Sequence, residues 1–267
     1  MGAISSPRGA RKKRCSEPMN PPTVGKIHLW CVDEFAPNER PHNTLSISEQ
    51  ARYESIRAAR VKQQYWQARW AVRHALSCYA PQVSPQQWQF SRNDYGRPSV
   101  QGPQLAFPLD FNISHTRGAL VMAFTARGAV GVDVEYIQRQ CRALAVAQRY
   151  FSASELADLR ALPVPLQRAR FFDLWTLKEA YIKACCMGLA IPLGSFSFDF
   201  AAPEIGIAFD ERRKDKPERW RFWSMPLSRY HQLAIALGCD DATQDVSIEA
   251  IRLHADGQLS PLALDGL

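Results

Sequence analysis

Two acidic residues supply the first candidates for chemistry. Asp133 and Glu135 stand two positions apart in Gly131-Val132-Asp133-Val134-Glu135, a β-branched run that predicts a strand. Because side chains alternate along a strand, both carboxylates project from one face while the two valines point into the core. Neighbouring carboxylates repel each other unless a cation or a proton intervenes. Carboxylate oxygens of this kind suit a Mg²⁺ ion that also binds a substrate phosphate. The alternative interpretation is that the two acids simply lie at the solvent-exposed end of a strand.

A second set of charged residues lies on a helix predicted from Phe171 to Leu189. Glu179 and Lys183 are four residues apart, so they share a face at the margin of an apolar stripe. Lys178 falls inside that stripe, where an unpaired charge is costly. This arrangement suits a buried anionic site, with Glu179 as a third oxygen donor. An exposed Glu-to-Lys pair, which contributes only about 0.2–0.5 kcal/mol, is the alternative.

The strand Phe111-Asn112-Ile113-Ser114-His115 ends in a hydroxyl and an imidazole, and both can donate hydrogen bonds to a phosphate. No Gly-x-Ser-x-Gly sequence and no glycine-rich phosphate loop accompanies them. These side chains therefore indicate binding rather than nucleophilic catalysis.

Composition bounds the class of protein. The chain has 267 residues, of which 46% are hydrophobic, enough for one large domain or two small ones. No run of 18 apolar residues occurs, so no membrane span and no membrane partner are expected. The seven cysteines form no Cys-x-x-Cys pair, which favours a reduced cytoplasm over a disulfide framework or a zinc site.

The positive charge is concentrated at the amino terminus. Five of the basic residues precede position 15, and subtracting them from the net charge of +7 leaves +2 for the remainder. A nearly balanced body argues against a nucleic-acid partner, which requires a basic face on a folded domain. Residues 1–24, rich in Gly, Ser, Pro and basic side chains, are expected to form a disordered basic tail.

The order of predicted elements indicates an α+β fold made of a repeated unit. A strand at 26–33 and a helix at 46–79, broken near Arg60, precede strands at 88–91, 111–114, 120–125 and 129–135. A capping box at Ser152–Glu155 opens a helix that Pro163 and Pro165 end. The long helix, with Gly188 as its C-cap, and further strands follow. We therefore expect halves at 25–130 and 131–267, with a site between them.

Four motifs in this order carry a resemblance to a known family. They are Tyr95-Gly96-Arg97-Pro98, Phe111-Asn112-Ile113-Ser114-His115, Gly131-Val132-Asp133-Val134-Glu135 and Trp175-Thr176-Leu177-Lys178-Glu179-Ala180-Tyr181-Ile182-Lys183. Together they resemble the 4′-phosphopantetheinyl transferases of the Sfp type, clearly over residues 45 to 200. The resemblance implies a pseudo-twofold pair of α+β halves with coenzyme A between them.

The resemblance also implies roles for individual residues. Mg²⁺ on the pyrophosphate would be held by Asp133, Glu135 and Glu179, and Lys183 would meet a phosphate. The other cofactor-binding candidates are Arg97, Ser114, His115 and Lys178. Family members carry further basic residues near the first long helix, and the register here leaves Arg52, Arg57, Arg60 and Lys62 as unassigned candidates.

The implied reaction uses a serine of an apo acyl or peptidyl carrier protein, which attacks the β-phosphorus of coenzyme A and releases adenosine 3′,5′-bisphosphate. Glu179, directly or through a metal-bound water, is the candidate base, and Lys183 the second catalytic residue. Duplicated halves complete the site within one chain, so a monomer is expected. The pathway that the carrier protein serves stays open.

Three other functions fit parts of the sequence. A Mg²⁺-dependent pyrophosphate hydrolase acting on coenzyme A or nucleotides would use the same acids with water as acceptor. An RNA-binding protein would use the basic tail. A catalytically silent carrier-protein binder would not need the complete set of Asp133, Glu135, Glu179 and Lys183.

Overall fold

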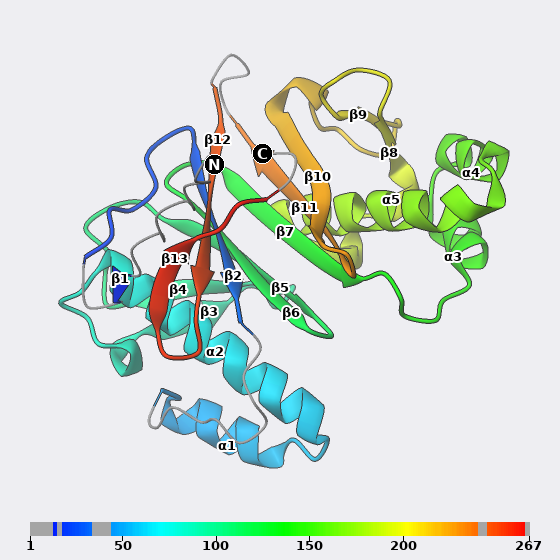
Figure 1. Ribbon diagram of the computed structural model, residues 1–267. Coiled ribbons are helices and arrows are strands. Elements are labelled where there is room, and N and C mark those ends of the chain that lie inside the picture. Colours follow the sequence, from blue (N-terminus) through cyan, green and yellow to red (C-terminus); the bar gives the residue numbers. More distant parts are fainter. Residues whose placement is uncertain (1–12, 15–17, 34–43, 240–244, 265–267) are drawn as a thin grey trace, which may run out of the picture.

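The computed structural model describes residues 13–14, 18–33, 44–239 and 245–264, and two similar halves account for most of them (Figure 1). The elements of the first half are β2 (Lys26–Val32), α1 (Ile47–Ser55), α2 (Ala59–Tyr79), β3 (Gln89–Arg92), β4 (Pro98–Gly102), β5 (Asp110–Thr116) and β6 (Ala119–Thr125). Those of the second half are β7 (Ala129–Tyr136), α3 (Ala143–Tyr150), α4 (Ala153–Ala161), α5 (Val164–Ala184), β8 (Phe196–Asp199), β9 (Gly206–Phe209), β10 (Trp220–Ser228) and β11 (His231–Gly238).

Both halves repeat one topology. Each begins with a strand, continues through helices and a two-stranded hairpin, and ends with an antiparallel pair. The sheet order is β2-β6-β5 in the first half and β7-β11-β10 in the second, with antiparallel neighbours throughout. The expected α+β fold with a pseudo-twofold pair of halves is confirmed.

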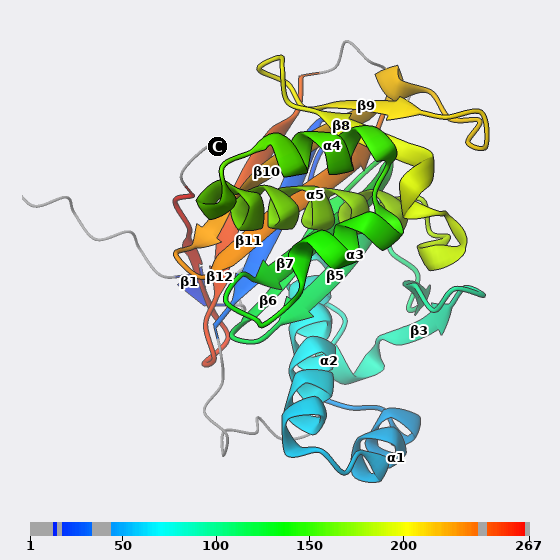
Figure 2. The same ribbon diagram turned by 90° about the vertical axis from the view of Figure 1, so that its right-hand side faces the viewer.

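The sheets pack face to face between the two long helices (Figures 1 and 2). Residues such as Leu29, Val132 and Ile235 form the apolar cluster between the sheets. The opposite face of the first sheet packs on α2, and α5 covers the opposite face of the second. Alternation along each strand explains this layering, since one face meets the partner sheet and the other a helix.

The halves are joined along β5 and β7 by side chains. Alternate N–H groups of β7 donate to β5 side chains across the seam, at distances between 3.1 and 3.3 Å: Val130 to Asp110, Val132 to Asn112, Val134 to Ser114 and Tyr136 to Thr116. These four bonds satisfy backbone donors that a neighbouring strand would otherwise take. The seam therefore brings Ser114 beside the two carboxylates of β7.

The boundary expected at residue 131 needs a correction at both ends of the second half. β7 already begins at Ala129. The carboxy-terminal strands β12 (Ser247–Leu253) and β13 (Gln258–Pro261) belong to the first sheet, because β12 pairs in parallel with β2 and β13 pairs with β12. Local sequence cannot show this pairing, since it joins segments more than 200 residues apart.

The structure describes residues 13–14 and 18–24 of the expected basic tail. β1 (Lys13–Arg14) pairs with β13. Met19 packs against the first core and donates its N–H to the Cys78 carbonyl at 2.8 Å. Residues 1–12 and 15–17 lie outside the described ranges. Among the described helices, none has the length and hydropathy to cross a membrane.

The bounds of α5 differ from the prediction at both ends. The helix begins at Val164, and Pro165 lies in its first turn, where the missing proline N–H removes no helical bond. Its C-cap is Cys185 rather than Gly188, and Cys186 follows with a φ of 59°. The break predicted near Arg60 is confirmed, with α1 ending at Ser55 and α2 beginning at Ala59.

Candidate active site

The face of β7 that carries the carboxylates lies directly against α5. At Gly131 the helix comes so close that a Cβ would stand 2.0 Å from the Ala180 carbonyl oxygen and 2.6 Å from the Ala184 nitrogen. No larger residue fits this contact. Asp133 and Glu135 follow on the same face, so the close approach places them beside the polar edge of the helix.

Asp133 is the centre of the cluster and is buried. Its Oδ1 accepts hydrogen bonds from Lys183 Nζ at 2.7 Å and from Ser114 Oγ at 2.9 Å. Lys183 Nζ also donates to Ser114 Oγ at 2.9 Å and to the Val132 carbonyl at 3.2 Å. The three groups therefore contact one another, with Ser114 reaching across the seam to a Lys183–Asp133 pair that lies within the second half. Lys183 thus pairs with Asp133 rather than with Glu179, the partner in the alternative interpretation of the sequence.

Glu135 is held by two donors that sequence reasoning missed. Trp175 Nε1 donates to Oε1 at 3.1 Å, and Arg139 contacts Oε2 with Nε at 3.1 Å and Oε1 with a terminal nitrogen at 3.4 Å. Burial and the nearby Asp133 carboxylate raise the pKa of Glu135, against the effect of Arg139. Glu135 lies on β7 and Arg139 in the bend after it, so their i, i+4 spacing did not predict a pair, because that spacing indicates pairing only within a helix.

Glu179 completes the acidic group from α5. Burial and then the Asp133 carboxylate raise the pKa of Glu179 to about 7, with a smaller contribution from Glu135 and opposition from Lys183. No described residue donates a hydrogen bond to its carboxylate. The three acids predicted from sequence therefore share one electrostatic environment.

The fit of this group to a metal ion is mixed. Among the described residues no set of three His, Cys, Asp or Glu side chains is already arranged to hold a metal. Two observations nevertheless favour a cation: the mutual repulsion of the carboxylates, and the buried Asp133 Oδ2, which has no hydrogen-bond partner. Oxygen-only donors with an unpartnered buried oxygen suit Mg²⁺ once the side chains shift.

His115 follows Ser114 on β5 and faces a group of positive charges. Desolvation, followed by the charge of Lys183 and then that of Arg69, lowers the pKa of His115 against the opposing charge of Asp133. Arg69, on α2, was missed because only the packing of α2 on β5 brings it near.

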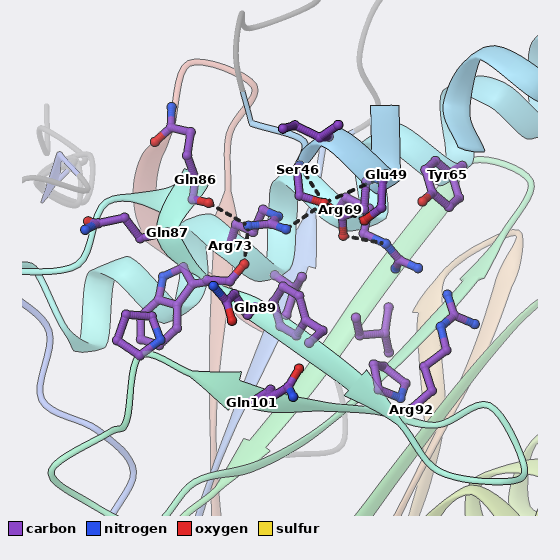
Figure 3. A pocket seen from close by; sticks show the side chains of 18 of the residues that line it. Ser46, Glu49, Tyr65, Arg69, Arg73, Gln86, Gln87, Gln89, Arg92 and Gln101 are labelled. Carbon is purple, nitrogen blue, oxygen red and sulfur yellow. Dashed lines mark hydrogen bonds and ion pairs between the residues drawn. The ribbon is translucent and has the colours of Figure 1, made fainter. Parts of the chain in front are cut away.

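A large cavity opens beside this group in the first half (Figure 3). Its volume is about 1180 Å³, and its lining includes Arg69, Arg92, Phe90 and Ile113. Figure 3 shows both arginines on one side of the cavity. Arg69 Nε pairs with Glu49 at 3.2 Å, and no described residue accepts from its terminal nitrogens. Two guanidinium groups at one wall suit an anionic ligand.

A second cavity, of about 210 Å³, lies between the halves. Ile113 and Pro98 line both cavities, and Lys183 lines the smaller one. An elongated ligand can therefore extend from the ammonium of Lys183 into the first half.

Arg97 has a different role from the expected phosphate contact. Its guanidinium is largely buried and donates to Asp110 at 2.6 Å and to the carbonyls of Phe111, Val130 and Lys183 at 3.0, 3.1 and 2.6 Å. These acceptors lie on β5, β7 and the end of α5. Arg97 thus joins the two halves and fixes the helix end that carries Lys183.

Lys178 is also not a ligand-binding residue in this structure. Its side chain is 0% exposed and pairs with Glu155 at 2.8 Å. It donates to the carbonyls of Leu193 and Phe196 at 2.8 and 2.7 Å. The charge predicted inside the apolar stripe is therefore neutralised by the glutamate of the predicted capping box, whose Oε2 also accepts from the Ser152 N–H.

Comparisons with known proteins agree with these motifs. Residues 129–237 match the family model described as the 4′-phosphopantetheinyl transferase superfamily. 4′-Phosphopantetheinyl transferase HetI of Nostoc sp. is 30% identical over 62% of this chain and 70% of its own length. Sfp of Bacillus subtilis is 38% identical over 41% of this chain and 46% of its own, and gsp of Aneurinibacillus migulanus is 37% identical over 41% and 43%.

Proposed function

Because this chain belongs to the 4′-phosphopantetheinyl transferase superfamily, it is an enzyme of that activity, and we propose how its own residues perform the transfer. The substrate is coenzyme A, and the acceptor is a serine of an apo acyl or peptidyl carrier protein. The products are holo carrier protein and adenosine 3′,5′-bisphosphate. One observation carries the assignment of the site: Asp133, Glu135, Glu179 and Lys183 meet at the seam beside the cavities.

We assign the metal site to Asp133, Glu135 and Glu179. When bound there, Mg²⁺ supplies positive charge that offsets the negative charge developing on the pyrophosphate oxygens. Asp133 offers the unpartnered Oδ2, and Glu179 a carboxylate without a described donor.

Lys183 binds a phosphate oxygen in this proposal. Its ammonium already lies between Asp133 and Ser114 and lines the cavity between the halves. The carrier serine oxygen forms the new bond to the β-phosphorus, and the bond from phosphorus to the bridging oxygen of the adenosine bisphosphate breaks. The ammonium of Lys183 offsets the negative charge that increases on these oxygens during the transfer.

Glu179 accepts the serine proton, directly or through water. In the metal-free protein the pKa of Glu179 is about 7, so its carboxylate is a stronger base than that of an exposed glutamate before a cation binds. Lys183 is four residues away on the same helix, so base and phosphate contact are carried by one rigid element.

The nucleotide phosphates meet His115 and Arg69. Arg69 lies outside the stretch from Arg52 to Lys62 in which the sequence suggested a basic contact, and it is supported by its place in the large cavity and its charge beside His115. Ser114 orients Lys183 and Asp133, since its hydroxyl already donates to one and accepts from the other.

The experiment is an intact-mass assay. Apo carrier proteins incubated with coenzyme A, Mg²⁺ and the enzyme should gain one phosphopantetheine group and lose the gain when the target serine is replaced by alanine. Release of adenosine 3′,5′-bisphosphate without carrier protein would instead indicate the hydrolase, for which the comparisons give no support. No modification of any of several apo carrier proteins, at adequate Mg²⁺ and coenzyme A, would overturn the proposal.

Two expectations stay predictions, and one question stays open. The carrier protein and its pathway are open, and so is the monomeric state expected from duplicated halves. A cytoplasmic location rested on the scattered cysteines. The structure describes five free thiols, but it has Cys78 disulfide-bonded, contrary to the expectation from the sequence.

A further inference from the structure

Two side chains of the protein already neutralise the carboxylates to which we assign the metal. Lys183 pairs with Asp133 at 2.7 Å, and Arg139 pairs with Glu135 at 3.1 Å. Lys183 has a place in the proposed transfer. Arg139 has none, although its pair with Glu135 is partly shielded, with side-chain exposures of 38% and 19%.

Both oxygens of Glu135 are engaged. Trp175 donates to Oε1 and is itself fixed against the Phe171 ring, with ring centres 5.9 Å apart. Arg139 Nε takes Oε2, and its guanidinium lies 5.3 Å from the centre of the Phe172 ring. Glu135 therefore offers Oε2 to a cation only after Arg139 withdraws, while Trp175 keeps the carboxylate oriented.

We propose that Arg139 is a displaceable counter-ion that makes metal binding at this site depend on coenzyme A. The inference rests on the proposed metal assignment. In the free enzyme a divalent cation competes with Arg139 for Glu135 and with Lys183 for Asp133. The pyrophosphate of coenzyme A gives both side chains another anionic partner and so releases the carboxylates. Metal and coenzyme A then bind with positive coupling, and each tightens the other by the same factor.

The arrangement of the free protein agrees with this inference. Within the described residues no three ligands are preassembled for a metal. Three carboxylates without counter-charges would repel each other and push α5 away from β7. Arg139 and Lys183 keep the acids close together in the absence of substrate, and their departure converts a set of ion pairs into a metal site.

The test is the affinity for Mn²⁺, measured from the electron paramagnetic resonance signal of the free ion. Wild type, Arg139→Gln and Arg139→Lys are titrated with and without coenzyme A. Arg170→Gln is the matched control, because Arg170 pairs with Asp173 at 4.0 Å on α5 and contacts none of the three acids. No transfer activity enters this measurement.

Arg139→Gln should bind Mn²⁺ roughly two- to fivefold more tightly without coenzyme A, the range expected for removing a partly exposed ion pair. The factor by which coenzyme A tightens Mn²⁺ binding should be smaller in Arg139→Gln than in wild type, by the same factor of roughly two to five. Arg139→Lys and Arg170→Gln should stay close to wild type. This pattern supports the inference.

Equal or weaker Mn²⁺ binding by Arg139→Gln overturns it. So does an Arg139→Lys variant that behaves like Arg139→Gln, since the effect then comes from packing on Phe172 rather than from charge. If neither wild type nor any variant binds Mn²⁺ even with coenzyme A, the metal assignment itself is wrong, which is a distinct result.

Discussion

Arg73 is the fifteenth residue of the 21-residue helix α2, and Lys178 is the fifteenth residue of the 21-residue helix α5. Each pairs with the glutamate of a capping box on the preceding helix: Arg73 with Glu49 at 2.5 Å and Lys178 with Glu155 at 2.8 Å. The two halves thus share one buried structural device, although their sequences differ. Capping-box glutamates that reach the next helix orient both helix pairs.

The remaining hydrogen bonds of the two cations also correspond. Arg73 donates to the carbonyls of Pro85 and Trp88, and Lys178 donates to those of Leu193 and Phe196. In each half these carbonyls lie in or beside a short 3₁₀ turn that precedes the hairpin. A buried cation bonded to a turn fixes where the hairpin leaves the helix.

The residues around the buried cation differ between the two halves. Counting from the shared cation, Glu179 of the second half corresponds to His74 of the first, and Lys183 corresponds to Cys78. On the strands, Asp133 and Glu135 face α5, whereas the face of β2 toward α2 carries Trp30 and Val32. The first half has an apolar face at the positions where the second half has a charged site on the same framework.

The sharpest way to break this comparison is to remove each buried cation. Lys178→Met leaves Glu155, only 2% exposed, without its counter-charge and should cost about 3–5 kcal/mol of unfolding free energy. Arg73→Met should cost less, because Glu49 is 14% exposed and keeps Arg69 at 3.2 Å. Urea unfolding of both variants gives the two values. A larger loss for Arg73→Met would contradict this ranking by the burial of the two glutamates.

Removing the charge that distinguishes the second half should affect chemistry instead of folding. Asp133→Asn keeps the size of the side chain but loses the anionic ligand, so transfer should fall at least about a hundredfold, more than the loss of a residue that only orients a metal ligand costs. The melting temperature should change little. Single-turnover transfer at saturating coenzyme A and Mg²⁺ measures the loss, and near-normal turnover would remove Asp133 from the site.

How much the sequence revealed depends on whether a feature is local. Asp133 and Glu135, the helix with Glu179 and Lys183, and the two halves follow from spacing and alternation within short segments. The capping box at Ser152 was also local. Its partnership with Lys178 was not, because it requires α4 and α5 to pack before the two charges meet.

The features that were missed join distant segments. Arg97 contacts the carbonyl of Lys183, 86 residues later, and Trp175 reaches back 40 residues to Glu135. The residue types were visible, but a guanidinium that binds carbonyls and one that binds phosphate look the same in sequence. Only burial, with five nearby acceptors for Arg97, distinguishes the two roles.

The stability of the folded protein should depend on pH in opposite directions through Glu179 and through His74, and this effect should be smaller than the loss of activity in Asp133→Asn. The pKa of Glu179 is raised to about 7, so its stabilising contribution is complete below about pH 4.5 and is lost as pH rises through 7. Burial lowers the pKa of His74, so its contribution is present above the usual 6.5 and is lost as pH falls below it.

The measurement is the melting temperature of metal-free protein from pH 5 to pH 8. Relative to wild type, Glu179→Gln should gain stability as pH rises, and His74→Gln should gain it as pH falls, each by on the order of a few degrees. Parallel curves for wild type and Glu179→Gln would contradict the raised pKa.

The smallest expected effect tests whether the first half still contributes to substrate binding. Four residues before the shared cation, the first half has Arg69 and the second has the buried Leu174. If Arg69 meets the 3′-phosphate of coenzyme A, Arg69→Gln should weaken coenzyme A binding roughly tenfold, the effect of losing one charge-assisted hydrogen bond. Binding of dephospho-coenzyme A, which lacks that phosphate, should hardly change. Lys26→Gln is the control, since Lys26 of β2 pairs with Glu249 at 3.3 Å. Calorimetry on both ligands decides the matter: if the ratio of the two affinities is the same in Arg69→Gln and wild type, Arg69 serves only to pair with Glu49.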